Sequence, residues 1–282
     1  MITLGIDVGG STTKIVGLEN GEIKAPQCIT AKDPVTSLFG AFGKYIYDNG
    51  ISLSDIEHVM LTGVGSAYIT GPLYGLPTSF TDEFLANALG ASYRSGLDRM
   101  VVVSMGTGTS FIKIEDKKVT RLGGLALGGG TLQGLSKIIF KTSDIRKIVD
   151  LAGNGNTCNV DLQIGDISKN DLPGLPLDVT ASNFGKADQT STSEDIAAGL
   201  INMILQTIGS SANFIAGGTG ITDFVLIGNL SQLPQSRMLF ESVGRLYGIQ
   251  FHIPDYTEYR TAAGAALSHI MAKDSDLLLT IE

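Results

Sequence analysis

The chain has 282 residues, with 20 Lys and Arg, 28 Asp and Glu and a formal net charge of −8. This length is enough for one large domain or for two lobes with ordinary hydrophobic cores. An acidic chain does not favour nucleic acid as its main partner, because neutralising phosphates needs a basic surface. No apolar run approaches the roughly 20 residues of a transmembrane helix, and the first residues lack the pattern of a signal peptide. We therefore expect no membrane association.

The cysteine and glycine contents add two expectations. Cys28 and Cys158 are the two cysteines of the chain. They cannot make a disulfide framework, so we expect a reducing, cytoplasmic compartment. The 36 glycines are about twice the average usage of roughly 7%. They cluster beside short strands, which indicates tight turns where the backbone approaches a ligand.

The first fifty residues predict three strands and a helix. The strands are expected at Ile2–Val8, Thr12–Leu18 and Glu22–Ile29, with Asn20-Gly21 as a hairpin turn between the last two. Pro34–Asp48 then has apolar residues at helical spacing and a proline at a favourable first position. This segment predicts an amphipathic helix.

The pattern then repeats about 100 residues later. His58–Leu61 reads as a buried strand, and Thr81 is expected to cap a helix that runs to about Tyr93. Three further strands are predicted at Met100–Ser104, Ser110–Ile114 and Lys118–Leu122. Two glycine-hinged hairpin units of the same kind predict two lobes of related topology that face a cleft.

The second half contains an irregular excursion and long helices. Asn154–Pro176 is rich in Asn, Asp, Gly and Pro and predicts irregular surface structure. Ser191–Ala216 predicts a long helix, with Ser191 and Glu194 as a capping box. Asp223–Ile227 predicts a buried strand and Ala262–Met271 a helix of small residues. We expect an N-terminal lobe at 1–95 and a C-terminal lobe at 96–282.

The first chemical motif is Gly5-Ile6-Asp7-Val8-Gly9-Gly10-Ser11-Thr12-Thr13-Lys14. A strand that turns through Gly9 and Gly10 can bring several backbone N–H groups onto a polyphosphate. Ser11 and Thr12 add hydroxyl donors and Lys14 a positive charge. The carboxylate of Asp7 suits Mg²⁺, directly or through water. The alternative is an ordinary hairpin with a type I′ turn.

The second motif repeats this chemistry at the start of the second unit. Gly106-Thr107-Gly108 forms a glycine turn, and Thr109 and Ser110 follow it with two more hydroxyls. We expect the turn to bind ATP phosphates opposite the first motif, and Thr109 and Ser110 to face the substrate. Taken alone, such a turn is as consistent with a purely structural role.

The third motif places an arginine before a run of glycines. Gly128–Gly130 leads into Thr131 and an expected helix, whose N-terminal N–H groups favour an anion. Arg121 ends the preceding strand and can face the same cleft; the alternative is a solvated charge.

Glu83 is the candidate catalytic base. Phosphoryl transfer to an alcohol needs an acceptor for the hydroxyl proton, and a carboxylate at the cleft provides one. The alternative is that Asp82 and Glu83 only stabilise the first turn of the helix through its dipole. Both interpretations fit the sequence.

Several other sites are excluded by pattern. The chain has no Gly-x-x-x-x-Gly-Lys-Ser/Thr segment, so phosphate binding of the Walker type is excluded. No Gly-x-Gly-x-x-Gly opens the N-terminal unit, which disfavours a dinucleotide fold. His58, His252 and His269 are scattered without metal-ligand spacing, and we expect them to be structural.

In this order the motifs resemble the nucleotide-binding signatures of the actin/sugar-kinase/Hsp70 superfamily, and more closely those of type II pantothenate kinases. The matching segments include Asp7–Lys14, Met105–Ser110, Ala181–Lys186 and Val225–Asn229. The resemblance implies an α/β fold: a two-lobe, actin-like ATPase of ribonuclease H-like architecture with a central ATP cleft.

The resemblance also implies roles for particular residues. Glu83 matches the family's catalytic base, and Arg121 matches the arginine that reaches substrate and phosphate. Thr261 lies in a segment that contributes to the nucleotide site. Further nucleotide-contacting positions are Thr107, Gly129, Gly130, Thr131, Leu132 and Gln133. The family dimerises through a long helix, which here is Glu194–Ala216, so we expect a homodimer.

The implied activity is transfer of the γ-phosphoryl group of MgATP to the hydroxyl of pantothenate, the first step toward coenzyme A. Two alternatives remain. One is a sugar or N-acetylhexosamine kinase of the same superfamily. The other is an ATP-dependent activator or nucleotide-binding scaffold, which a cysteine set for an iron–sulfur cluster would favour.

Overall fold

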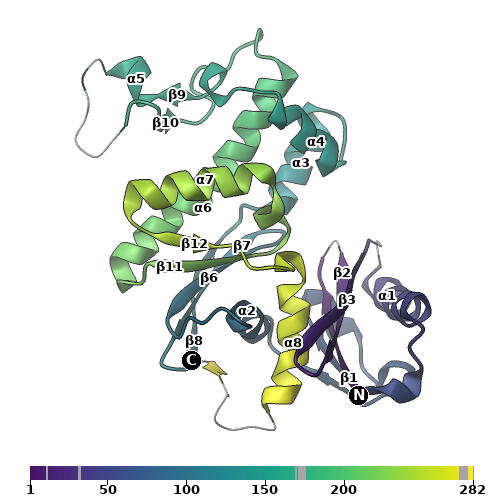
Figure 1. Ribbon diagram of the computed structural model, residues 1–282. Helices are drawn as coiled ribbons and strands as arrows, with labels where there is room; N and C mark the ends of the chain where they lie inside the picture. The colour runs from purple at the N-terminus through teal and green to yellow at the C-terminus, as the bar shows by residue number, and fades with distance from the viewer. Residues whose placement is uncertain (11, 31–32, 169, 171–175, 273–278, 282) are drawn as a thin grey trace. The chain divides into compact units, whose positions relative to one another are not determined.

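The computed structural model shows an α/β chain that forms two compact units (Figure 1). The residues that it describes are 1–10, 12–30, 33–168, 170, 176–272 and 279–281. The first unit comprises Met1–Gly124, Val225–Asn229 and His252–Glu282, and the second comprises Leu125–Phe224 and Leu230–Phe251. These units group the chain differently from the expected lobes 1–95 and 96–282, and that division stays a prediction.

The first sheet has five strands in the order β3-β2-β1-β4-β5. Its strands are β1 (Ile2–Val8), β2 (Thr13–Glu19), β3 (Glu22–Ile29), β4 (Ile56–Thr62) and β5 (Thr78–Phe80). The first three strands form an antiparallel meander, whereas β4 runs parallel to β1 and β5 parallel to β4. The predicted turn between β2 and β3 is confirmed, because Asn20 and Gly21 both have positive φ (52° and 76°).

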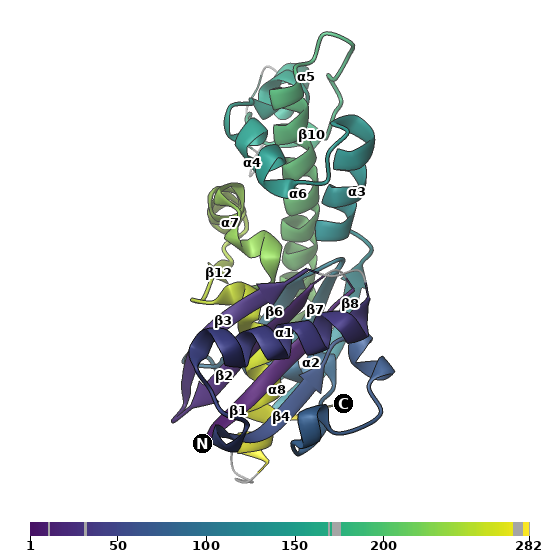
Figure 2. The same cartoon turned by 90° about the vertical axis from the view of Figure 1, so that its right-hand side faces the viewer.

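One face of this sheet is covered by helix α1 (Pro34–Asn49), as Figure 2 shows. The Asp33 side chain caps α1 by accepting a hydrogen bond from the Thr36 N–H at 2.7 Å. Gly50 ends the helix in the left-handed conformation. Alternate strand residues such as Leu4, Ile6 and Leu61 pack beneath α1 in one core, so the remaining residues of β1 and β4 face the opposite side.

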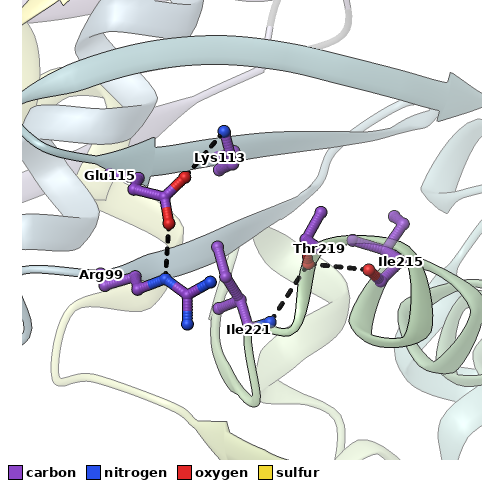
Figure 3. A network of polar contacts seen from close by, with 6 residues as sticks. All are labelled: Arg99, Lys113, Glu115, Ile215, Thr219 and Ile221. Atoms are coloured by element: carbon purple, nitrogen blue, oxygen red, sulfur yellow. Dashed lines mark hydrogen bonds and ion pairs between the residues drawn. The ribbon is translucent and has the colours of Figure 1, made fainter.

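The second sheet has six strands in the order β12-β11-β6-β7-β8-β13. These are β6 (Met100–Met105), β7 (Thr109–Glu115), β8 (Lys118–Leu125), β11 (Asp223–Ile227), β12 (Gln250–His252) and β13 (Thr280–Ile281). Glu115, at the end of β7, pairs with Arg99 at 2.6 Å and with Lys113 at 2.9 Å (Figure 3). The hydrogen bonds that Lys113 and Arg99 donate lower the pKa of Glu115, so the Glu115 carboxylate is ionised at neutral pH.

Helices α2 (Glu83–Ser92) and α8 (Arg260–Met271) lie side by side in the first unit (Figure 1). Three glycines permit the close approach. A Cβ added at Gly264 would lie 1.8 Å from the Ala86 carbonyl oxygen, and one at Gly90 would lie 1.9 Å from that of Arg260. Likewise a Cβ on Gly5 of β1 would lie 1.9 Å from the Ala262 oxygen. Helix α8 therefore packs directly on the backbone of both α2 and β1.

The second unit is built around the long helix α6 (Ser193–Thr219). Its other helices are α3 (Gly129–Ile139), α4 (Ile145–Gly153), α5 (Ile164–Ile167) and α7 (Pro234–Tyr247). Helix α6 packs against α4 and α7. At its C-terminal end the Thr219 hydroxyl donates to the Ile215 carbonyl at 2.8 Å and accepts from the Ile221 N–H (Figure 3).

The expected irregular excursion contains regular structure. Strand β9 (Leu162–Gln163) pairs with β10 (Thr180–Ser182), and α5 follows β9 directly. The excursion is thus only partly irregular over its described residues; 169 and 171–175 lie outside them. Single-turn 3-10 helices complete the chain at Leu53–Asp55, Val64–Tyr68, Leu73–Gly75, Thr157–Asn159, Asn229–Gln232 and Thr257–Tyr259.

Two predicted helix caps were wrong by one residue. Thr81 still belongs to the strand side, since its N–H donates to the Leu61 carbonyl, and Asp82 caps α2 instead. The Ser191 hydroxyl belongs to a turn that precedes α6, where it accepts a hydrogen bond from the Asp188 N–H at 3.0 Å. Thr192 therefore caps α6 by accepting from the Asp195 N–H.

Within the part of the chain that the structure describes, no helix is both long enough and apolar enough to cross a bilayer.

Gly264→Ala should lower the stability of the fold by about 1–3 kcal/mol or more, as overpacking does, because its Cβ would meet backbone rather than a movable side chain. The matched control is Gly40→Ala in α1, where nothing lies within 4 Å of the added Cβ. That change should raise stability by about 0.5–1 kcal/mol through the unfolded state. Urea unfolding of both variants measures the difference, and an equal effect at the two positions would refute the packing argument.

Candidate active site

A row of polar side chains crosses the first sheet at the carboxyl ends of β1 and β4. Asp7 is the register partner of Lys14 on β2 and of Thr62 on β4, and Lys14 is in turn the partner of Cys28 on β3. Register partners on neighbouring strands point to the same face. These four side chains therefore lie side by side on the face away from α1.

The preceding row on the same face is apolar. Gly5 is paired with Val16 and Met60, Val16 packs with Ala262 and Ala263 of α8, and Met60 packs with Ala86 and Ala265. Helices α2 and α8 thus cover the sheet up to Gly5, and the polar row begins two residues later.

Glu83 joins this polar row from the first turn of α2. Burial raises the pKa of Glu83, the negative charges of Asp7 and Asp82 raise it further, and Lys14 lowers it. Burial also raises the pKa of Asp7, and Lys14 again opposes the shift. Glu83 therefore lies within electrostatic range of both Asp7 and Lys14. Lys14 is only 8% exposed, so its charge acts with little screening.

The first turn of α2 assigns different tasks to its two acidic residues. Asp82 caps the helix, because its Oδ1 accepts hydrogen bonds from the Phe84 N–H at 2.8 Å and the Leu85 N–H at 3.0 Å. Glu83 is half-buried and makes no hydrogen bond or ion pair with the residues that the structure describes. Asp82 alone therefore supplies the side-chain cap of α2. The Glu83 carboxylate remains available to accept a proton or a hydrogen bond from a ligand.

Arg121 lies beside the same helix terminus. Its guanidinium carbon is 5.2 Å from the centre of the Phe84 ring, which follows Glu83 directly. Arg121 is exposed on β8, and the Phe84 ring gives the guanidinium a defined position by a cation–π contact. The structure thus brings Arg121 and Glu83, separated by 38 positions in sequence, to one end of α2.

The first glycine turn is closed by a hydrogen bond from the Gly9 N–H to the Thr12 carbonyl at 3.0 Å. Gly10 is exposed at its tip, which suits the expected contact with phosphate. Ser11, which we also expected at this site, lies outside the described residues.

The second glycine turn, Gly106–Gly108, joins β6 to β7 and has Met105 paired with Thr109 at its base. A Cβ on Gly228, which has φ +96°, would lie 2.4 Å from the Met105 carbonyl oxygen. The Gly228 N–H donates to the Thr257 carbonyl at 3.0 Å. The segment Val225–Asn229, one of those that resemble nucleotide-binding signatures, therefore lies against the strand that enters the second turn. Thr109 is buried, Ser110 half-buried and Thr107 exposed.

Two groups of expected nucleotide contacts lie on other elements of the chain. The Thr261 hydroxyl donates to the Asn87 Oδ1 at 2.7 Å in the buried interface of α8 and α2. Residues Gly129 to Gln133 form the first turn of α3 in the second unit. There the Thr131 hydroxyl is held by the Gly128 N–H and the Ala126 carbonyl. The nucleotide contacts expected of these residues stay predictions.

Gly63 is a residue that the sequence did not single out. It follows β4 with φ +84°, and a Cβ there would lie 2.5 Å from the Asp7 Oδ1 and 2.6 Å from the Val8 carbonyl oxygen. Only glycine permits this approach. The sequence signal that could have identified it is the pair Thr62-Gly63 at the end of a buried strand. The ends of parallel neighbouring strands lie at the same edge of a sheet, so this pair lies next to Asp7 at the end of β1.

The residues present fit a magnesium ion. Mg²⁺ prefers oxygen ligands, and is usually held by one or two carboxylates, waters and substrate phosphates. Asp7 supplies a carboxylate, and Thr62 beside it supplies a buried hydroxyl without a partner among the described residues. Among the residues that the structure describes, no group of three or more His, Cys, Asp or Glu is arranged to hold a metal ion.

The fold places the chain in a broad class. An activator of 2-hydroxyisocaproyl-CoA dehydratase from Clostridium difficile, with bound ADPNP, aligns over 98% of this chain and 97% of its own, with a TM-score of 0.67 and 20% identity. A ROK family glucokinase from Streptomyces griseus, with glucose and AMPPNP, covers 95% of this chain and 99% of its own, with a TM-score of 0.60 and 13% identity. The chain thus has the actin-like ATPase fold that was expected.

Sequence comparison narrows this class. A family model described as Fumble matches residues 93–243, more than half of the chain, so the chain belongs to the Fumble family. A model of the BadF/BadG/BcrA/BcrD ATPase family matches residues 4–140. A type II pantothenate kinase of Staphylococcus epidermidis is 29% identical over 93% of this chain and 97% of its own length. One of Staphylococcus aureus is 27% identical over 80% and 84%. The predicted resemblance is confirmed.

Glu83→Gln should stabilise the protein at neutral pH. The raised pKa of Glu83 means that the folded state disfavours the ionised carboxylate, so the ionised group costs stability above its folded pKa. The Tm of Glu83→Gln should exceed that of the parent protein at pH 8. This difference should shrink as the pH falls through the folded-state pKa of Glu83, because the parent's carboxyl then becomes protonated.

The neighbouring Asp82→Ala is the contrasting control and should lower stability by about 1 kcal/mol, as loss of an N-cap does. Thermal unfolding between pH 5 and pH 8 compares the variants. A loss of stability in Glu83→Gln at pH 8 would show that Glu83, too, supports the helix terminus.

Proposed function

We propose that this protein is a pantothenate kinase, which transfers the γ-phosphoryl group of MgATP to the hydroxyl of pantothenate. The observation that carries the proposal is the half-buried Glu83 carboxylate, which lies within electrostatic range of Asp7 and Lys14 and makes no hydrogen bond or ion pair with the described residues. The relatives that share most of this chain's length and are named type II pantothenate kinases support the choice of substrate.

Glu83 is the proposed general base. As the pantothenate hydroxyl oxygen forms its bond to the γ-phosphorus, the bond from that phosphorus to the ADP oxygen breaks, and the hydroxyl proton passes to a Glu83 carboxylate oxygen. A raised pKa makes the carboxylate a stronger base than one in water. Burial and the nearby Asp7 and Asp82 charges thus improve the proton acceptor at the expense of stability.

Positive groups and amides would balance the charge of the triphosphate. The turns Gly9–Thr12 and Gly106–Gly108 offer backbone N–H groups, and Lys14 contributes a buried charge. Arg121 would meet oxygens whose charge shifts during transfer, because its planar fork can contact two of them. Asp7 would hold Mg²⁺, which neutralises phosphate charge when bound.

The remaining expected contacts complete the proposal. The free N–H groups of Gly129 and Gly130 at the start of α3 suit phosphate binding; Leu132, Gln133 and Thr261 are proposed to line the nucleotide site. Thr109 and Ser110, which follow the second turn, are proposed to face pantothenate. We further propose that the protein works in the cytoplasm.

Two other functions lead to different outcomes in the same assay. A hexosamine kinase would need the same base with a different acceptor pocket. An activator that hydrolyses ATP would release phosphate without an alcohol acceptor, and its iron–sulfur cluster would need cysteines. The chain has two cysteines, Cys28 in the first unit and Cys158 in the second. An activator would also not need Glu83 as a base, because it has no alcohol acceptor to deprotonate.

We also propose a homodimer that forms through α6, supported by exposed apolar side chains on α6 and α7. Gly199 packs against Val160 and Phe184, and Gly209 packs against Val243, all within the second unit. These glycines therefore do not offer free surfaces for a second helix. Exposed Phe214 on α6 and Met238 on α7 (76% and 71% exposed) remain as apolar contacts for a partner copy.

Glu83→Gln should lower kcat for pantothenate by roughly 10²-fold or more, as loss of a positioned base does, while the dissociation constant of an ATP analogue stays unchanged. An ATP-coupled assay over pantothenate, pantetheine and hexosamines measures turnover and acceptor choice together. Near-wild-type turnover of the variant, or phosphorylation of a hexosamine in preference to pantothenate, would overturn the proposal.

Arg121→Ala should reduce kcat/KM for pantothenate by roughly 10²-fold, similar to removal of one charge-stabilising donor, with little change in analogue affinity. Arg121→Lys should restore only part of the loss, because it keeps the charge without the fork. If both variants behave like the parent, Arg121 is a solvated charge; if only analogue affinity falls, it belongs to the nucleotide pocket.

Light scattering at micromolar concentration should give twice the chain mass of 29.6 kDa. Phe214→Glu should shift the protein toward that single-chain mass, whereas the exposed Tyr47→Glu change on α1 should not. A mass near 29.6 kDa for the parent protein would rule out the dimer.

A further inference from the structure

The hydroxyl of Thr62 is a buried polar group without a partner. Thr62 is 1% exposed, and its Oγ1 makes no hydrogen bond within the described part of the chain. An unpaired hydroxyl in a dry interior costs free energy, so native structures rarely keep one unless water or a ligand completes it. Its position beside a functional carboxylate makes a ligand the relevant explanation.

The sheet register fixes the direction of this hydroxyl. Leu61 packs in the core under α1, so Thr62 points to the opposite face, where Met60 packs against Ala86 of α2. Thr62 is the direct neighbour of Asp7 in the parallel pair of β1 and β4. The hydroxyl and the Asp7 carboxylate therefore open onto the same layer, and the Glu83 carboxylate lies within electrostatic range of Asp7.

A second buried polar group, on helix α2, has the same property. Nδ2 of Asn87 has no partner among the described residues, although Oδ1 of the same side chain accepts from Thr261. Asn87 lies four positions after Glu83 in α2, hence on the same face of the helix. An unpaired hydroxyl beside the Asp7 carboxylate is a suitable environment for an ordered water, which needs two to four polar partners.

We propose that Thr62 is a positioning residue of the magnesium site: its hydroxyl donates a hydrogen bond to a water molecule that Asp7 and the bound ion share. This inference rests on the proposed use of MgATP, but not on pantothenate as the acceptor. Gly63 supports the arrangement, because the missing side chain lets the Thr62-Gly63 backbone approach the Asp7 carboxylate. Thr62 thereby orients the carboxylate and its water without binding substrate itself.

The test uses Thr62→Val, which keeps the shape and removes the hydroxyl, and Thr62→Ser, which keeps the hydroxyl. ADP-NP binding is titrated with Mg²⁺, and separately in EDTA without metal. In Thr62→Val the Mg²⁺ concentration at half-saturation should rise about tenfold, the lower end for loss of an outer-shell partner. Binding in EDTA should stay the same, and Thr62→Ser should stay within about twofold of the parent, far below that loss.

Thermal unfolding of the metal-free protein provides the independent readout. Removing a hydroxyl that has no partner should leave Tm unchanged or raise it. Thr13→Val on the neighbouring strand is the matched control, because the Thr13 hydroxyl accepts from the buried Ser37 hydroxyl at 2.7 Å on the α1 side. That variant should lose stability and keep the parent's Mg²⁺ dependence.

The outcomes separate this inference from the proposed function. An unchanged Mg²⁺ midpoint in Thr62→Val, or a lower Tm of the metal-free variant, would overturn the role of Thr62 and indicate a structural water only. Failure of the parent to phosphorylate pantothenate would overturn the proposed function and leave the Mg²⁺ result standing. Binding of ADP-NP by the parent without any Mg²⁺ dependence would overturn both.

Discussion

The architecture of the first unit depends on the close packing of α8 between the first sheet and α2. Gly5, Gly90 and Gly264 remove the side chains that would separate these backbones. Helix α2 consequently lies close to the sheet, and its first turn holds Glu83 next to Asp7. Arg260 reinforces the contact, because its buried guanidinium donates to the Gly90 and Tyr93 carbonyls near the end of α2. The position of the proposed base is thus set by packing some distance from the chemistry.

The polar layer that this packing creates is unfavourable for the folded state. Glu83 and Asp7 both have raised pKa values because burial removes water from their carboxylates. The positive charge of Lys14 offsets part of this cost. Asp82 caps α2 beside Glu83, and Gly63 lets the backbone after β4 approach the Asp7 carboxylate. Unpaired Thr62 and Asn87 groups add to the cost. A cluster of buried charges and unpaired polar groups that lowers the stability of the folded state is typical of functional sites.

Much of the first unit could be predicted from the sequence because its signals are local. Strands β1, β3 and β11 have the predicted bounds, since apolar runs and the Asn20-Gly21 turn define them. The caps of α2 and α6 were missed by one residue, because two adjacent residues can each cap and only tertiary hydrogen bonds decide between them.

Long-range relations could not be predicted in the same way. The motifs singled out Asp7, Lys14, Glu83 and Arg121 as candidate site residues, but nothing in the spacing reveals that Phe84 holds Arg121 beside Glu83. Small residues on α6 such as Gly199 and Gly209 could accept a helix of another chain, but side chains of the same chain pack against both. Thr62 and Gly63 gain meaning only from the parallel pairing of β4 with β1.

The central claim is that the two glycine turns of the first unit hold the triphosphate and present its terminal phosphate to Glu83. A crystal structure with MgADP-NP tests it most directly. The account predicts that backbone N–H groups of Gly9–Thr12 and of Gly106–Gly108 contact phosphate oxygens, with the metal near Asp7 and the γ-phosphate facing Glu83. A triphosphate bound away from both turns, or a γ-phosphate that faces away from Glu83, would contradict it.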